Sequence, residues 1–216
     1  MSSSSEINAV RFKDRRDAGQ QLAQRLVHLG KEDPLVLGLP RGGVPVAAEI
    51  ASALAAPLDV LVVRKLGCPW QPELGIGAVG EGNARVLNGQ LISRLGLGEQ
   101  QIEEVSEIER AEVERRVRRY RGDRQLPAIE GRTVIVVDDG LATGSTAKAA
   151  IEILREMGAR RVILAVPVAP SETAHKMAEI ADEVVVLQTP YGFIAIGQWY
   201  DDFTQVTDEE IDGTLR

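Results

Sequence analysis

Cysteine and aromatic residues are scarce in this sequence of 216 residues. The single cysteine, Cys68, excludes a disulfide within the chain and any zinc site built from several cysteines. We therefore expect a reducing compartment, the cytoplasm. The two histidines, His28 and His175, have no neighbours that suit a metal site, and we interpret both as structural.

Long apolar runs and an excess of positive charge are also missing. No stretch approaches the ~18 consecutive apolar residues of a membrane-spanning helix, and Met1 to Asn8 lacks the apolar core of a signal peptide. We expect a soluble chain without a membrane partner, in which residues 1–8 form a disordered tail. The formal net charge of −7 repels nucleic acid, which disfavours a nucleic-acid-binding regulator.

What is present is the composition of one α/β domain. Hydrophobic residues make up 44% and charged residues 26% of the chain, which suits a single globular domain over residues 1–216. Apolar strands alternate with helical segments, and this order predicts a mostly parallel central sheet flanked by helices. The predicted strands are Leu35 to Leu39, Leu58 to Val63, Val134 to Val137, Arg161 to Val166 and Glu183 to Leu187.

The most informative stretch runs from Val134 to Thr146. Four β-branched residues predict a strand buried on both faces, and the strand ends in the carboxylates of Asp138 and Asp139. A turn of small residues follows, and Ala147 to Met157 has the composition of a helix. Unpaired N–H groups at the start of that helix favour a phosphate, whereas the two carboxylates suit the hydroxyls of a sugar diol. Together these sites describe a ribose 5-phosphate.

This stretch resembles the phosphoribosyl pyrophosphate (PRPP) signature of the type I phosphoribosyltransferases. The resemblance implies an enzyme that transfers the 5-phosphoribosyl group from PRPP to a nitrogen of a nucleobase or similar heterocycle and releases pyrophosphate. It implies that Asp138 and Asp139 bind the ribose hydroxyls and, with Arg41, are the catalytic residues. The implied cofactor is Mg²⁺, which arrives with PRPP and for which the same two aspartates are the candidate contacts. The implied 5-phosphate ligands are Ala142, Thr143, Gly144, Ser145 and Thr146.

A second loop, Pro40 to Val44, shows the same order of strand, small residues and helix. Two glycines let backbone amides approach an anion, and the guanidinium of Arg41 suits phosphate oxygens. Arg64 and Lys65 end another predicted strand, at the edge where ligands bind in open α/β sheets. Two interpretations stay open for that basic pair: it contacts pyrophosphate, or it belongs to the solvated surface. The pyrophosphate ligands implied by the resemblance are Arg41, Gly42 and Gly43. Arg64 and Lys65 join them if the basic pair contacts pyrophosphate.

Residues 66–83 are rich in glycine and proline and predict a long mobile loop. The family closes a lid over the site at this place in the chain, because water would capture the cationic sugar. This lid has no basic residue of its own, and Glu73 is only a weak candidate for a site contact. Ile76 to Val79 and Arg85 to Leu87 predict a small hairpin. The glycine pattern from Gly75 to Gly80 lacks the strand and helix that a dinucleotide-binding turn needs.

Glu99 to Arg121 predicts one long helix with a narrow apolar stripe. Its acidic first half and basic second half match the helix dipole. The basic run at 115–124 is open to two interpretations, a solvated face or a site for RNA or an anionic effector. The apolar stripe favours a partner subunit, so we expect a homo-oligomer, a dimer.

The C-terminal residues 188–216 contain most of the aromatic side chains. The family places a hood over the acceptor base in this part of the chain, and a planar heterocycle stacks well on aromatic rings. The alternative is a small aromatic core that fixes the tail. The predicted base-binding residues are Trp199, Tyr200 and Phe193.

Two questions about function stay open. At the position of Ala142, family members that act on 6-oxopurines have an aspartate, so such an acceptor is disfavoured, but no acceptor is identified. The alternative to an enzyme is a regulatory module that senses PRPP or a nucleotide without catalysis and transmits occupancy through the helix at Glu99 to Arg121. The missing lid cation favours that module, whereas the acidic pair and the aromatic tail favour an enzyme.

Overall fold

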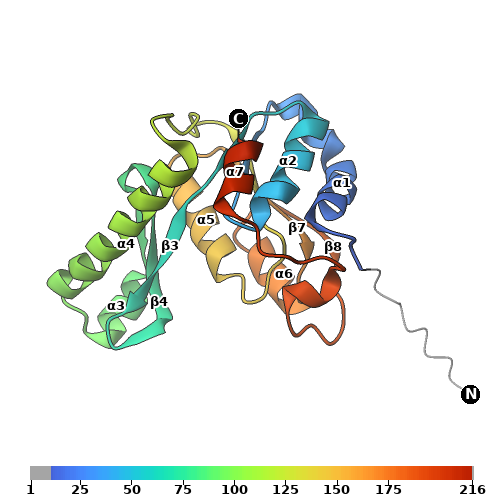
Figure 1. Ribbon diagram of the computed structural model, residues 1–216. Coiled ribbons are helices and arrows are strands. Elements are labelled where there is room, and N and C mark those ends of the chain that lie inside the picture. Colours follow the sequence, from blue (N-terminus) through green and yellow to red (C-terminus); the bar gives the residue numbers. More distant parts are fainter. Residues whose placement is uncertain (1–10, 216) are drawn as a thin grey trace, which may run out of the picture.

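The computed structural model describes residues 11–215, which form a larger lobe and a smaller lobe that projects from it (Figure 1). The disordered tail predicted for residues 1–8 lies outside the described residues. None of the helices between residues 11 and 215 combines the length and the apolar character that a membrane span requires.

The larger lobe is built on a five-stranded parallel sheet with the strand order β2-β1-β6-β7-β8. Its strands are β1 (Leu35–Gly38), β2 (Leu58–Val60), β6 (Thr133–Val137), β7 (Arg161–Val168) and β8 (Glu183–Gln188). All of them overlap strands predicted from the sequence, and the predicted parallel α/β architecture is confirmed. Every residue of β1 and of β6 is buried, as expected for strands that are covered on both faces.

Helices cover both faces of this sheet. One face carries α1 (Arg15–Leu26) and α2 (Gly43–Leu54), and the other carries α5 (Ser145–Glu156) and α6 (Ser171–Ala178). Alternate residues of each strand supply the two cores, because successive side chains point to opposite faces. Val134 and Val136 pack with α5, whereas Ile135 and Val137 pack with α2. The carboxyl ends of the strands are therefore the edge where loops can form a site.

The smaller lobe contains an antiparallel sheet in the order β3-β4-β5. Its strands are β3 (Val63–Cys68), β4 (Gln71–Gly80) and β5 (Arg85–Leu87). The prediction of a long loop at residues 66–83 is wrong, because β3 and β4 pair as a hairpin over most of that range. The predicted pairing of Ile76 to Val79 with Arg85 to Leu87 is confirmed, from Gly77 onward. Movement of this hairpin as a lid stays a prediction.

Close approach of the backbones explains why the hydrophobic pattern missed most of this sheet. A Cβ atom at Gly77 would lie 2.3 Å from the carbonyl oxygen of Val86, and one at Gly67 would lie 2.4 Å from that of Pro72. Glycines break the hydrophobic alternation, yet they are the residues that let these strands pack so closely. The glycine pattern inside β4 thus belongs to an antiparallel strand and not to a dinucleotide-binding turn.

The long helix predicted in the middle of the chain is confirmed as α4 (Glu99–Arg121). It packs on β3 and β4 and buries Ile102, Val113 and Tyr120 in an apolar core that the smaller lobe shares with α2 and β2 and that α3 (Gly89–Leu95) extends. Most of the charged side chains of α4 form ion pairs with other side chains of the molecule.

Glu112 illustrates how the basic run of α4 is used. Its carboxylate accepts hydrogen bonds from Arg115 at 2.7 Å and from Arg116 at 2.6 Å. These bonds lower the pKa of Glu112 to about 2. Arginines that are already paired along the helix favour the interpretation of a solvated face over a site for RNA or an anionic effector.

The first described residues meet the C-terminal tail beside the sheet. Phe12 and Tyr200 form a parallel bridge, in which the N–H of Phe12 donates to Trp199 at 2.9 Å and the N–H of Asp201 donates to Phe12 at 2.8 Å. The tail then continues into α7 (Asp208–Thr214), which lies between α2 and α4 (Figure 1). The 3-10 helices of the described chain are η1 (Val27–Glu32), η2 (Glu81–Asn83) and η3 (Ile196–Trp199).

Candidate active site

Two adjacent carboxylates follow the carboxyl end of β6, the middle strand of the parallel sheet. Asp138 accepts a hydrogen bond from the backbone N–H of Asp139 at 2.9 Å. The carboxylate of Asp139 accepts one from Nε of Arg15 at 2.8 Å, and its carbonyl oxygen accepts one from the hydroxyl of Tyr200 at 2.6 Å. Residues from both ends of the chain therefore hold the acidic pair in place.

Arg15, the first residue of α1, is a site residue that the sequence did not reveal. Its guanidinium also donates to the carbonyl oxygen of Thr204 at 2.8 Å and lies 4.0 Å from the ring centre of Phe203. A cation over an aromatic face adds an attraction of about 0.5–2 kcal/mol. No motif surrounds Arg15, and it is 124 positions away from Asp139 in the sequence, so only the folded chain brings the two together.

The electrostatics of the acidic pair favour a ligand that donates hydrogen bonds or carries positive charge. Burial and the nearby charge of Asp139 raise the pKa of Asp138 well above its ordinary value. Burial also raises the pKa of Asp139, although the hydrogen bond from Arg15 opposes that rise. Hydroxyl donors or a cation would relieve the repulsion between the two carboxylates.

Asp138→Asn is expected to stabilise the fold at neutral pH. Because the pKa of Asp138 is raised in the folded state, the unfolded chain ionises first, and stability falls as the pH rises from about 4 through the folded-state pKa. Asparagine cannot ionise and removes that loss. The gain should appear as a higher Tm at pH 7 and should vanish near about pH 3, where the carboxyl is protonated in both the folded and the unfolded chain. Thermal unfolding at both pH values measures it.

Asp123→Asn is the matched control for this change, because Asp123 is exposed in the loop after α4. It should alter Tm much less at either pH. A gain for Asp138→Asn of equal size at the acidic and the neutral pH would contradict an ionic origin.

The loop between β1 and α2 lies directly against the acidic pair. A Cβ atom at Gly42 would lie 1.9 Å from Oδ2 of Asp139, and one at Gly43 would lie 2.3 Å from the carbonyl oxygen of Val137. No side chain fits in either place, so this approach requires the two glycines. The structure thus brings the predicted pyrophosphate loop and the predicted ribose site together.

The second predicted anion loop, Ala142 to Thr146, leads into α5. Its hydroxyl side chains are exposed, and Oγ1 of Thr143 lies 2.9 Å from Oγ of Ser145. Gly144 has a φ of 75°, which favours glycine, and a Cβ atom there would come within 2.9 Å of Thr173. The loop therefore presents hydroxyls and the first N–H groups of α5, the kinds of donor that bind a phosphate.

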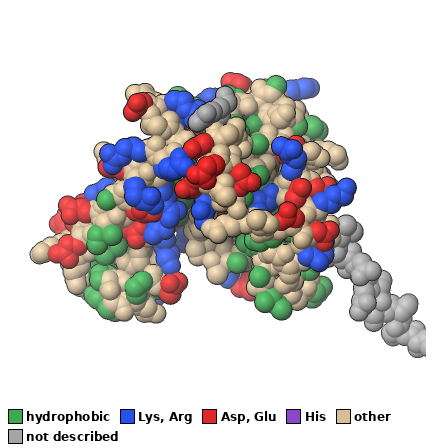
Figure 2. Space-filling view, viewed as in Figure 1, with side chains coloured by type: hydrophobic (Ala, Val, Ile, Leu, Met, Phe, Trp, Pro, Cys, Tyr) green, Lys and Arg blue, Asp and Glu red, His purple; other side chains and the backbone are tan. Residues whose placement is uncertain are grey.

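A cleft of about 570 Å³ opens between this loop and the smaller lobe. Thr143, Ser145 and Thr146 line one wall, and Arg64 and Lys65 of β3 line the opposite wall. Figure 2 shows Lys and Arg side chains gathered along the hollow between the two lobes. The structure therefore places the two basic residues of β3 opposite the predicted 5-phosphate loop.

Both of these cations already have a carboxylate partner. Nε of Arg64 lies 2.7 Å from Glu109 of α4, and Nζ of Lys65 lies 3.4 Å from Glu73 of β4. Glu73, the weak candidate from the sequence, thus sits in the wall of the cleft as a partner of Lys65. An anion that enters the cleft would have to compete with these carboxylates.

Arg41 lies apart from the cations of β3. It follows Pro40 through a cis peptide bond, and its guanidinium faces Asp208 of α7 at 3.9 Å. The N–H of Gly43 donates to Leu39 at 3.0 Å, so Gly43 serves close packing more directly than anion binding. The predicted pyrophosphate residues therefore form two groups, one at the glycine loop and one on β3.

A model of known protein families matches most of this chain. The family described as phosphoribosyl transferase domain covers residues 11–197, which include the acidic pair and both loops. The chain belongs to the phosphoribosyl transferase family.

Individual relatives agree with this assignment. "Putative phosphoribosyl transferase Rv0571c" of Mycobacterium tuberculosis H37Rv and its counterpart MT0597 in strain CDC 1551 are 52% identical to the chain over 200 residues, 93% of this chain and 45% of theirs. The chain thus spans about half the length of the curated relatives it matches. The crystal structure of TT1426 from Thermus thermophilus is 45% identical, with a TM-score of 0.88 and a coverage of 95% of this chain and 98% of that one.

The aromatic tail of this family member divides into two parts. Contrary to the prediction, Tyr200 has no free ring face for an acceptor: it is 1% exposed, with Phe12 at 5.4 Å and Phe203 at 5.0 Å between ring centres. The alternative of a small aromatic core is correct for this residue. Phe193 and Trp199 are half-buried and stack on each other at 6.3 Å. They remain the predicted contacts of the base.

The phosphoribosyl transferase site offers two adjacent carboxylates to a metal ion. Between residues 11 and 215, no group of three or more His, Cys, Asp or Glu side chains is arranged to hold one. Two carboxylates fit Mg²⁺ when water and substrate oxygens supply its other ligands, as is usual for this ion. Contact of substrate-bound Mg²⁺ with Asp138 and Asp139 fits this donor set and stays a prediction.

Proposed function

We propose that this phosphoribosyl transferase moves the 5-phosphoribosyl group of PRPP onto a nitrogen of a nucleobase or similar heterocycle and releases pyrophosphate. The observation that carries the proposal is the close approach of the glycine loop to the acidic pair, since a Cβ atom added at Gly42 would lie only 1.9 Å from Oδ2 of Asp139. Pyrophosphate and ribose are joined at C1 of PRPP, so the loops that bind them must meet. The loop from Ala142 to Thr146 takes the 5-phosphate at the other end.

In this proposal the chain acts mainly by positioning the substrates. Asp138 and Asp139 accept hydrogen bonds from the ribose hydroxyls, and Arg15 holds Asp139 in position for them. The acceptor nitrogen attacks C1 as the bond to pyrophosphate breaks, and the nearby carboxylates offset the positive charge that develops on the sugar. Arg41 contacts the departing pyrophosphate, and bound Mg²⁺ supplies positive charge that neutralises it.

The acceptor in this proposal lies against Phe193 and Trp199. Nε1 of Trp199 is buried and has no hydrogen-bond partner within the described part of the chain. A carbonyl oxygen or ring nitrogen of the acceptor would satisfy this donor. The resemblance at Ala142 continues to disfavour a 6-oxopurine.

A regulatory module that binds PRPP or a nucleotide without catalysis is the second candidate function. The observation in its favour is that each predicted pyrophosphate cation has a carboxylate partner: Glu109 for Arg64, Glu73 for Lys65 and Asp208 for Arg41. Such pairing weakens the hold on a leaving pyrophosphate. Cytoplasmic location and a homodimer also stay predictions.

Release of pyrophosphate from Mg²⁺-PRPP tests the proposal. Nucleobases, small aromatic amines and small carboxylates are added one at a time, and binding of PRPP is measured in parallel. Release that depends on one acceptor would establish the transferase and name its substrate. Binding without release for any acceptor would favour the regulatory module, and absence of PRPP binding would contradict both.

A further inference from the structure

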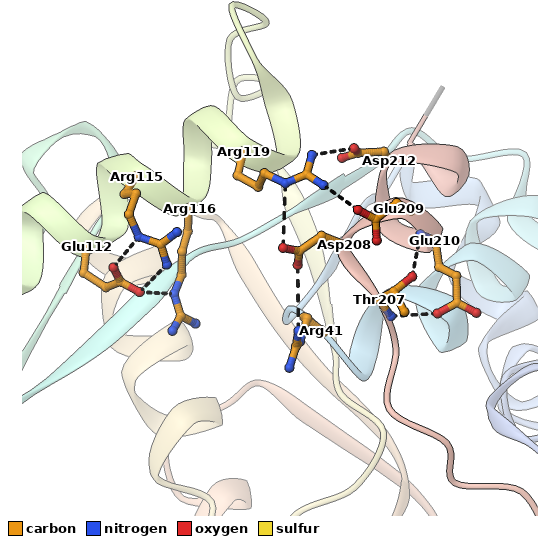
Figure 3. A network of polar contacts seen from close by, with 10 residues as sticks. All are labelled: Arg41, Glu112, Arg115, Arg116, Arg119, Thr207, Asp208, Glu209, Glu210 and Asp212. Atoms are coloured by element: carbon orange, nitrogen blue, oxygen red, sulfur yellow. Dashed lines mark hydrogen bonds and ion pairs between the residues drawn. The ribbon is translucent and has the colours of Figure 1, made fainter.

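A carboxylate from the C-terminal helix reaches the cation of the glycine loop. Oδ1 of Asp208, in α7, lies 3.9 Å from the guanidinium of Arg41, and its Oδ2 lies 3.7 Å from Nε of Arg119, in α4. Figure 3 shows Asp208 between the two arginines, which come from distant parts of the chain. We call Arg41, Asp208 and Arg119 the α7 latch.

The contact of Asp208 with Arg41 is loose and open to exchange. Among residues 11–215, Asp208 is the one carboxylate within 4.0 Å of this guanidinium, and their separation of 3.9 Å is too long for a hydrogen bond. The side chain of Arg41 is 40% exposed, so an anion from solution can reach it. The attraction between the two groups therefore holds Arg41 weakly, while it neutralises much of the charge that an anion would meet.

Several contacts besides the charge of Asp208, which also interacts with Tyr120 of α4, hold α7 in place. Ile211 is fully buried between α2 and α4, in the apolar cluster that also contains Val206 and Leu215. Arg119 keeps two other partners in the same helix, Asp212 at 2.6 Å and Glu209 at 3.3 Å. Thr207 and Glu210 cap the start of the helix. Loss of one charge at Asp208 should therefore leave α7 in place.

We propose that Asp208 is an internal competitor of pyrophosphate for Arg41 and so sets the affinity of the glycine loop for that anion. The proposal rests on the proposed function only in assigning pyrophosphate to this loop. When an anion pairs with Arg41, Asp208 keeps its contact with Arg119, so the exchange leaves no charged group without a partner. The latch thereby weakens retention of the product.

A calorimetric titration of the full chain with inorganic pyrophosphate and Mg²⁺ tests the latch. Asp208→Asn should bind pyrophosphate about two- to fivefold more tightly than the original protein, the range expected when an exposed ion pair is removed. The gain should shrink as salt is raised, because the contact is exposed and screened. Glu209→Gln is the matched control: Glu209 lies next to Asp208 and pairs with Arg119, but has no contact with Arg41, so it should leave the affinity unchanged.

Further variants test whether the gain in affinity acts through Arg41. In an Arg41→Gln background, Asp208→Asn should bring no gain, since the competed cation is gone. Equal or weaker binding in Asp208→Asn, a gain of the same size in Glu209→Gln, or a gain that survives Arg41→Gln would overturn the proposal. If neither the original protein nor Asp208→Asn binds pyrophosphate, the latch is also overturned, and titration of the same samples with PRPP shows whether the proposed function fails with it.

Discussion

The double variant Asp138→Asn, Asp139→Asn is expected to bind PRPP at least about 100-fold more weakly than the original protein. Each hydrogen bond from a ribose hydroxyl to a carboxylate is worth about 1.5–3 kcal/mol, so the loss of two amounts to a factor of roughly 10² to 10⁴ in Kd. Asparagine keeps the shape of the side chain but removes the charge and one acceptor oxygen. Calorimetric titration with Mg²⁺-PRPP measures the loss, and release of pyrophosphate should fall at least as far.

The tail provides the control for this variant. Asp201 and Asp202 are also adjacent aspartates, but both are exposed. The carboxylate of Asp201 pairs with Arg11, that of Asp202 accepts from the hydroxyl of Thr204, and neither pairs with Arg15 as Asp139 does. Asp201→Asn, Asp202→Asn should leave the affinity for PRPP nearly unchanged. Circular dichroism should show that both double variants are folded. Unchanged affinity in a folded Asp138→Asn, Asp139→Asn protein would remove the ribose assignment.

Arg121→Met is expected to cost about 3–5 kcal/mol of stability, the usual result of removing one partner from a buried ion pair. The side chain of Arg121 is 2% exposed, and its Nε lies 3.0 Å from Asp59 of β2. The same guanidinium binds Glu81 of η2 and donates to the carbonyl oxygen of Val60 at 2.7 Å. Methionine fills much of the space but leaves two buried carboxylates without their cation. Urea unfolding of the variant and the original protein measures the difference.

Arg118→Met is the control for that loss. Arg118 lies one turn earlier in α4 and its side chain is 75% exposed, so its removal should change stability by less than about 0.5 kcal/mol. Arg121 also joins the end of α4 to the parallel sheet, and a large effect would show that the two lobes depend on this charge cluster. Equal losses of stability in Arg121→Met and Arg118→Met would contradict the dependence of the two lobes on this charge cluster.

Local sequence was enough to predict the architecture and the position of the two small-residue loops at the ends of β1 and β6. A buried parallel strand needs an unbroken apolar run, and the run at Val134 to Val137 has that form and lies in β6. The helix at Glu99 to Arg121 was predicted with its bounds because its stripe and its charge order follow the helical period. The acidic pair and the loop after it are adjacent in the chain, so a single stretch of sequence carries their arrangement.

Contacts between distant residues could not be predicted in this way. Arg15 and Asp139 are 124 positions apart, and Arg121 and Asp59 are 62 apart, and no local period links either pair. The sequence placed Arg121 in a basic run that suggested solvent, and Tyr200 in an aromatic cluster that suggested a base, yet both are buried. The spacing of apolar residues predicts which face of a helix or strand is buried, but it does not predict which other element covers that face. The partners of these side chains follow from how the strands and helices pack, and that packing is a property of the whole fold.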